Sequence, residues 1–205
     1  MVLALKALER LKEGNKRFIS GAVKQNKLPS LNQLSNMPLE QEPFAILLGC
    51  SDSRVPAEII FDQGIGDLFV IRVAGNIVAP SQIGSVEFAA ERFGVKLVVV
   101  LGHSNCGAIL ATIDAFQHPV PEKSPNLRSI INHINISVKD VLQKEHETPE
   151  ILMQEAVRAN INASVDHLRH GSEILKQLTE KNDLLIIGAE YSLDTMLVNF
   201  FDQGV

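Results

Sequence analysis

The chain has 205 residues, of which 45% are hydrophobic, and it carries a formal net charge of −5. This length suits one domain with a sizeable core, and the acidic balance argues against a basic face for nucleic acid or an anionic membrane. No apolar stretch approaches the roughly 18 residues of a membrane span, and the N-terminus lacks the apolar segment of a signal peptide, so we expect a cytoplasmic protein.

In chain order, apolar residues first recur at helical spacing over residues 3–19, which predicts an amphipathic helix. A polar stretch with two prolines follows and is typical of a surface arm. Apolar runs then predict strands at 44–50, 67–75, 96–103 and 183–191. Because these runs are continuously apolar, we expect a mostly parallel sheet that helices cover on both faces.

Helices are predicted between these strands. The segments are 56–63, 81–94 and 106–116, and a long helical region spans about 126–180 with a stop near Asn182. The alternation of strand and helix makes α/β the predicted fold class. We interpret the polar segment 117–126 as a surface connection within a single domain that spans residues 1–205.

The chain has two cysteines, Cys50 and Cys106, and at this length it does not need a disulfide in a reducing compartment. Cys50 ends the first predicted strand, His103 ends the third, and Cys106 begins a helix. Ligand sites in open α/β sheets form beyond the carboxyl ends of strands, so we expect these side chains at one edge. Two cysteines and one histidine can bind zinc and leave a fourth position for water. The alternative is two ordinary core thiols and an unrelated histidine.

Asp52 and Arg54 follow Cys50 almost directly. A carboxylate beside zinc can occupy the fourth position, which closes the site, or it can accept a hydrogen bond from zinc-bound water. An arginine two residues on can hold the carboxylate in a bidentate pair and keep it off the metal. An ordinary surface ion pair is the alternative, and it would contribute little. Gly102 and Gly107, which flank the second ligand segment, would allow the backbone to approach closely.

Several segments of the chain resemble β-class carbonic anhydrases. They are EGNKRF (13–18), GCSDSRVPAEIIFDQGIGDLFVIRVAGN (49–76), SQIGSVEFAAERFG (81–94), VVVLGHSNCGAI (98–109) and GAEYSLDT (188–195). The resemblance covers nearly the whole chain, and C-x-D-x-R followed by H-x₂-C is a specific signature of that family. It implies that Cys50, His103 and Cys106 bind one zinc ion per subunit. It also implies that Asp52 and Arg54 form the catalytic dyad.

The resemblance further implies an obligate dimer, often built into a tetramer, with active sites at the subunit interface and an N-terminal helical arm over about residues 1–40. Gln41 matches a glutamine that plant-type members use to bind substrate across the interface, and Phe69 matches an apolar wall of the pocket. Phe88 lies where plant-type members carry a tyrosine. Leu47 stands where some bacterial members carry a tryptophan that marks a bicarbonate-regulated closed form. We therefore expect the plant-like form, with a site that is open over a wide pH range.

The predicted reaction is the reversible hydration of CO₂ to bicarbonate and a proton, with zinc-bound hydroxide as the nucleophile. Phe69, Val73, Phe88 and Gly107 belong to the predicted substrate pocket, whose apolar walls suit a small uncharged molecule. Asp52 would orient the hydroxide, and the family permits its exchange onto zinc as a fourth ligand at low pH. The sequence identifies no residue as the proton shuttle.

Three other functions use the same residues. An enzyme on the same scaffold could hydrolyse COS or CS₂, because a zinc hydroxide attacks any linear heterocumulene. A closed Cys₂HisAsp site could serve structure or sensing without catalysis, although the pairing of Asp52 with Arg54 argues against this. A dithiol redox protein is disfavoured because the two thiols are far apart in sequence and form no C-x-x-C motif.

Overall fold

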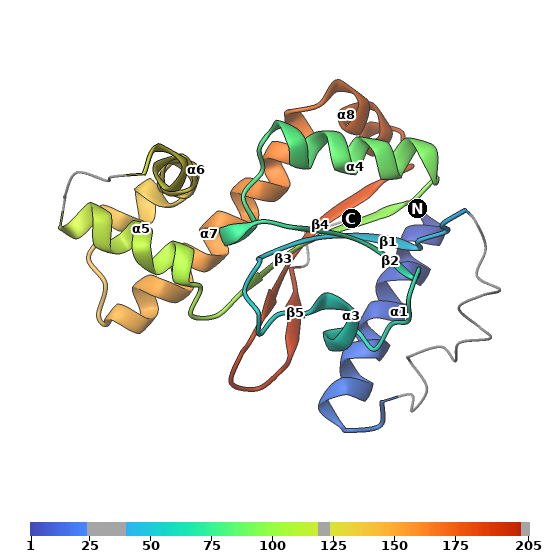
Figure 1. Cartoon of the computed structure of the whole chain (residues 1–205), viewed down its shortest axis with the longest axis horizontal. Helices are drawn as coiled ribbons and strands as arrows, with labels where there is room; N and C mark the ends of the chain where they lie inside the picture. The colour runs from blue at the N-terminus through green and yellow to red at the C-terminus, as the bar shows by residue number, and fades with distance from the viewer. Residues whose placement is uncertain (24–39, 119–123, 202–205) are drawn as a thin grey trace.

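A computed structural model describes residues 1–23, 40–118 and 124–201 of the chain. Its centre is a five-stranded sheet in the order β2-β1-β3-β4-β5 (Figure 1). The strands are β1 (Ala45–Gly49), β2 (Leu68–Arg72), β3 (Leu97–His103), β4 (Leu185–Tyr191) and β5 (Val198–Phe200). The first four pair in parallel, and β5 runs antiparallel to β4 at one edge. The predicted α/β class and mostly parallel sheet are confirmed, whereas β5 is a strand that the sequence does not predict.

Helices cover both faces of this sheet. They are α1 (Val2–Ile19), α3 (Ala57–Ile60), α4 (Pro80–Arg92), α5 (Gly107–Gln117), α6 (Pro125–Leu142), α7 (Pro149–His170) and α8 (Glu173–Glu180), with a 3₁₀ turn, η1 (Ala74–Asn76), after β2. Helices α1 and α3 lie on one face, and α4, α7 and α8 lie on the other (Figure 1). Helices α5 and α6 lie beyond the carboxyl ends of the strands. None of the helices in the described ranges is long and apolar enough to cross a membrane.

Strand β1 shows why the apolar runs are continuous. Its side chains alternate between the two faces, as in any strand, but both faces are covered. Ile46 and Leu48 belong to the core under α4 and α7, whereas Ala45 and Leu47 belong to the core under α1 and α3. Every residue of β1 is therefore buried. Cys50 continues the first of these two series and comes to lie on the α4 and α7 side.

The helical region predicted over 126–180 is correct in content but consists of three helices. Thr148 caps α7 by accepting a hydrogen bond from the backbone N of Ile151 (3.3 Å), and Pro149 occupies the first turn of α7. Ser172 caps α8 in the same way, through the backbone N of Leu175 (3.1 Å). The predicted N-terminal helix is confirmed as α1. The rest of the predicted arm and the middle of the predicted connection at 117–126 lie outside the described residues, and the single domain stays a prediction.

The EGNKRF segment joins α1 to distant parts of the chain. Asn15 is buried, and its Nδ2 donates to the carbonyl oxygens of Ile60 (3.3 Å) and Met196 (3.0 Å). Its Oδ1 accepts a hydrogen bond from the backbone N of Val198 (2.9 Å). One side chain therefore satisfies backbone groups of α3 and of the segment that leads into β5.

We expect Gly14→Ala to destabilise the protein, because an added Cβ would lie 1.8 Å from the carbonyl oxygen of Phe61. Overpacking of this kind costs about 1–3 kcal/mol, and each kcal/mol lowers Tm by roughly 2–4 °C at this chain length. Gly84→Ala is the matched control, because Gly84 is also helical and nothing lies within 4 Å of its added Cβ. That control should gain about 0.5–1 kcal/mol. Thermal unfolding by circular dichroism compares the two variants, and equal Tm values would contradict the prediction.

Candidate metal centre

Cys50, His103 and Cys106 come together at the carboxyl edge of the sheet. Strands β1 and β3 are parallel neighbours, with Gly49 paired to Leu101, so the residue after β1 and the last residue of β3 reach the same place. Cys106 is the N-cap of α5. The three side chains are buried, and their ligand atoms all lie within 4.8 Å of one another. The two Sγ atoms are 4.0 Å apart.

The His103 ring is held with one nitrogen ready to bind a metal. Its Nδ1 lies 2.9 Å from the carbonyl oxygen of Ser104, which can only accept, so Nδ1 carries the proton and Nε2 offers a lone pair. Nε2 is buried and has no hydrogen-bond partner among the described residues. Asp52 Oδ2 is 3.9 Å away, which is too far for a hydrogen bond. A buried nitrogen without a partner beside two sulfur ligands fits a zinc ion.

The two thiols affect each other's ionisation strongly. The hydrogen bond from the Cys106 thiol, helped by the backbone amides of Asp52 and Gly75, outweighs burial and lowers the pKa of Cys50 to about 4 from its usual 9.0. The same Cys50–Cys106 hydrogen bond, together with burial, raises the pKa of Cys106. One thiolate is therefore present at neutral pH. Because metals bind thiolates, an ion entering the site would displace the remaining proton.

The turn after β2 presents a backbone amide to the first thiol. The backbone N of Gly75 donates to Cys50 Sγ at 3.3 Å. Gly75 has φ +67°, and an added Cβ would lie 2.7 Å from Ile134 Cδ1, so this position requires glycine. The turn is closed by a hydrogen bond from the backbone N of Asn76 to the carbonyl oxygen of Val73 (3.1 Å).

Asp52 and Arg54 form a bidentate pair beside these ligands. Arg54 Nε donates to Asp52 Oδ1 (3.0 Å), Nη2 donates to Oδ2 (2.8 Å), and the Arg54 backbone N also donates to Oδ1 (2.9 Å). The Arg54 side chain holds the pKa of Asp52 well below its usual range, and the pair raises the pKa of Arg54. Asp52 is therefore ionised and turned toward Arg54.

Two of the predicted pocket residues lie beside the metal-ligand group. Val73 exchanges backbone hydrogen bonds with Gly49 and Ser51, so it runs alongside Cys50. Gly107 begins α5 directly after Cys106, and nothing lies within 4 Å of an added Cβ there. The space in front of Gly107 is therefore open for a small molecule.

The other predicted pocket residues lie elsewhere within the chain. Phe69 pairs with Ile46, four residues before the first ligand, which is roughly 13 Å along the strand. Phe69 packs against Phe88 and Phe93, with ring centroids 6.5 and 6.2 Å apart. Gln41 is exposed and precedes β1, whereas the ligand follows it. A pocket role for these residues stays a prediction.

Two residues that hold the site belong to no metal-ligand or catalytic motif. Arg72 Nε donates to the carbonyl oxygen of Cys50 (3.1 Å), and its Nη2 donates to that of Asp52 (2.6 Å), which fixes the loop after β1. Asn160 Nδ2 donates to the carbonyl oxygen of Gly75 (2.8 Å). A cation that ends an apolar run could have drawn attention to Arg72. Asn160 gives no such signal, because it lies within a helix far along the chain.

Comparisons with known proteins agree on one family. A family model described as "Carbonic anhydrase" matches residues 45–198. "Carbonic anhydrase 2" of Mycobacterium tuberculosis is 34% identical over 92% of this chain and 88% of its own length. "Carbonic anhydrase" of Mycolicibacterium smegmatis is 36% identical over 91% of this chain and 88% of its own. The solved β-carbonic anhydrase CcaA superposes with a TM-score of 0.76 at 27% identity, covering 95% of each chain.

Replacing Arg54 by Gln should raise the pKa of Asp52 toward the ordinary value of about 3.9, because the guanidinium hydrogen bonds are lost. A lowered folded-state pKa means that the wild-type pair stabilises the protein above the unfolded-state pKa and loses this contribution as the pH falls through the folded-state value. The pKa of Asp52 is measured in wild type and in R54Q from the carboxyl ¹³C chemical shift during an acid titration. Asp183, whose pKa Lys96 lowers, is the internal control and should not move. An unchanged Asp52 titration in R54Q would contradict this.

Proposed function

The chain belongs to the β-class carbonic anhydrase family, and from this premise we propose that it hydrates carbon dioxide reversibly to bicarbonate and a proton at a zinc ion. The observation that carries the proposal is the meeting of two thiols and a buried imidazole nitrogen, which has no hydrogen-bond partner within the described ranges, next to an ionised Asp52–Arg54 pair. Both halves are needed, because the first can hold a metal and the second can orient a water molecule.

Cys50 Sγ, His103 Nε2 and Cys106 Sγ would hold the zinc ion, one per subunit. When bound, zinc supplies a Lewis acid that lowers the pKa of water to about 7. The Asp52 carboxylate is ionised and lies near His103 Nε2, so it can accept a hydrogen bond from the attacking water and fix its orientation. Val73 and Gly107 border the space where carbon dioxide would approach.

The hydrogen bonds from Arg54 determine whether Asp52 stays off the metal or binds it as a fourth ligand. Three hydrogen bonds hold the carboxylate in place, so reaching the metal as a fourth ligand would require at least part of this pair to break. We propose that at neutral pH Asp52 stays paired with Arg54 and leaves the fourth metal position open. Asp52 binds zinc as the fourth ligand only under acid conditions.

We propose that the protein works as a homo-oligomer, a dimer or a tetramer, in which a second copy completes each site. Gln41, Phe69 and Phe88 lie away from the ligands of their own chain, and Phe88 is 53% exposed. Strand β2 is the edge strand of the sheet on that side, so its outer backbone groups face away from β1. An apolar surface at a strand edge suits a protein interface.

We also propose a cytoplasmic location. Cys50 and Cys106 are joined by no disulfide and are the sulfur ligands of the proposed site, which fits a reducing compartment. A small uncharged substrate calls for no nucleic-acid or membrane partner.

Stopped-flow CO₂ hydration from about pH 6 to 9, with zinc counted in the same sample, tests the proposed activity. Turnover should follow zinc content, and a zinc-loaded protein without turnover would refute the proposal.

Cys106→Ser should lose most zinc, because a ligand is gone. Asp52→Asn should keep zinc but lose about ten- to a hundredfold in kcat/KM, because the water is no longer oriented. Normal zinc and turnover in C106S, or a wild-type rate in D52N, would contradict these roles.

A complementation experiment tests the shared site. Asp52→Asn and Gln41→Ala subunits should each be weakly active alone, and mixing them by unfolding and refolding should restore activity. A mixed dimer holds one doubly altered site and one intact site, so equal random mixing should restore about a quarter of wild-type turnover. If Gln41 serves its own chain, every site carries a defect and mixing restores nothing.

A further inference from the structure

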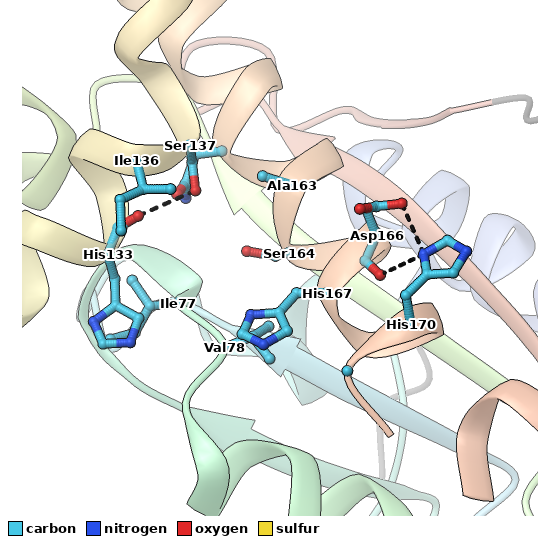
Figure 2. A pocket seen from close by; sticks show the side chains of 12 residues that line it. Ile77, Val78, His133, Ile136, Ser137, Ala163, Ser164, Asp166, His167 and His170 are labelled. Carbon is cyan, nitrogen blue, oxygen red and sulfur yellow. Dashed lines mark hydrogen bonds and ion pairs between the residues drawn. The ribbon is translucent and has the colours of Figure 1, made fainter. Parts of the chain in front are cut away.

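A cavity of about 630 Å³ lies between α6, α7 and the segment that follows η1. Figure 2 shows His133 and His167 on opposite sides of it, with Ile77 beside His133 and Val78 beside His167. Asn160 also lines the cavity and, unlike the histidines, is buried. The Asn160 side chain therefore lines the cavity and also contacts the turn that reaches Cys50.

Two side chains of α7 donate hydrogen bonds to the carbonyl oxygens of two consecutive residues in that turn. Asn160 Nδ2 donates to the carbonyl oxygen of Gly75 (2.8 Å), and Ser164 Oγ donates to that of Asn76 (3.1 Å). Asn160 and Ser164 are four residues apart and so lie on the same side of the helix. Both are at least 96% buried, at 1% and 4% exposure, so neither hydrogen bond competes with bulk water.

The turn needs such support because its backbone is strained. Gly75 has φ +67°, and the next residue, Asn76, has φ +43°, which is unfavourable for a residue with a side chain. Conformations of this kind cost about 1–3 kcal/mol and persist only where the surroundings impose them. Ile134 of α6 also packs against Gly75. The position of the Gly75 amide on Cys50 Sγ is thus imposed by the helices behind it.

We propose that Asn160 is a positioning residue for the metal centre: by holding the Gly75 carbonyl, it keeps the Gly75 amide hydrogen-bonded to Cys50 Sγ. This inference rests on the proposed zinc site. A hydrogen bond to a metal-binding thiolate reduces the negative charge that the sulfur donates, which makes the metal a stronger Lewis acid toward water. Two thiolates cancel the charge of a zinc ion, so a site of this composition gains from every group that withdraws charge from sulfur.

Asn160→Leu tests the proposal, because leucine has nearly the shape of asparagine but no polar atom, so it cannot donate to the Gly75 carbonyl. Ser164→Ala is the second variant and removes the neighbouring hydrogen bond. Ser137→Ala is the matched control, because Ser137 lines the same cavity but donates to the carbonyl oxygen of His133 in its own helix (3.2 Å). Each zinc-loaded protein is assayed for kcat against pH, and its cobalt-substituted form is examined by absorption spectroscopy.

In N160L the sulfur-to-cobalt charge-transfer band should move to longer wavelength, because the thiolate is a stronger donor without its hydrogen bond. The pH midpoint of kcat should rise, and kcat near neutral pH should fall about tenfold. S164A should shift the band and the midpoint in the same direction by less, and S137A should match wild type. A wild-type band and midpoint in N160L overturn the proposal. If N160L does not fold, Asn160→Ala takes its place, and a wild-type band in that variant overturns the proposal.

The spectroscopic measurement keeps this inference separate from the proposed function. The band reports on the thiolate and requires no turnover. A wild-type protein that binds cobalt through sulfur but does not hydrate carbon dioxide would refute the proposed activity, while the shift in N160L would still support the role of Asn160. A merely structural role for Asn160 would lower Tm and leave the band in place, which counts against the proposal.

Discussion

Parallel pairing of β1 with β3 brings the carboxyl ends of two neighbouring strands to one edge of the sheet, and the ligand group depends on it. Cys50 follows one strand, His103 ends the other, and Cys106 lies where the chain turns into α5. Ile46 and Leu48 share a face with Cys50, whereas Ala45 and Leu47 pack on the opposite face. A slip by one residue would turn the thiol to the opposite face.

The sequence predicts the parts of the fold that have strong periodic signals. The four parallel strands and the helices between them appear within a few residues of their expected bounds, because each carries an apolar run or stripe. Strand β5 has three residues and only one of them is buried, so its pairing with β4 leaves no apolar pattern. The division of the region 126–180 follows from Thr148–Pro149 and Gly171–Ser172, which are local capping signals inside one continuous helical pattern.

The residues of the candidate site also fall into those that the sequence reveals and those that it does not. Cysteine, histidine and the Asp52–Arg54 pair attract attention because their chemistry is unusual at the end of a core strand. Asn160 is 85 residues from the carbonyl that it holds, and this contact exists only after α7 has packed on η1. Gln41 and Phe88 are a different case, because the chain does not bring them to its own ligands, and their place in the pocket stays a prediction.

Asn15 also sets an order of events during biosynthesis. It shares a hydrogen bond with Val198, across 183 residues of chain, and helix α1 packs on the face of the sheet that β5 completes. A ribosome releases α1 before β5, so a growing chain holds α1 without this hydrogen bond until β5 has emerged. We therefore expect α1 to complete its native contacts only after β5 has paired with β4.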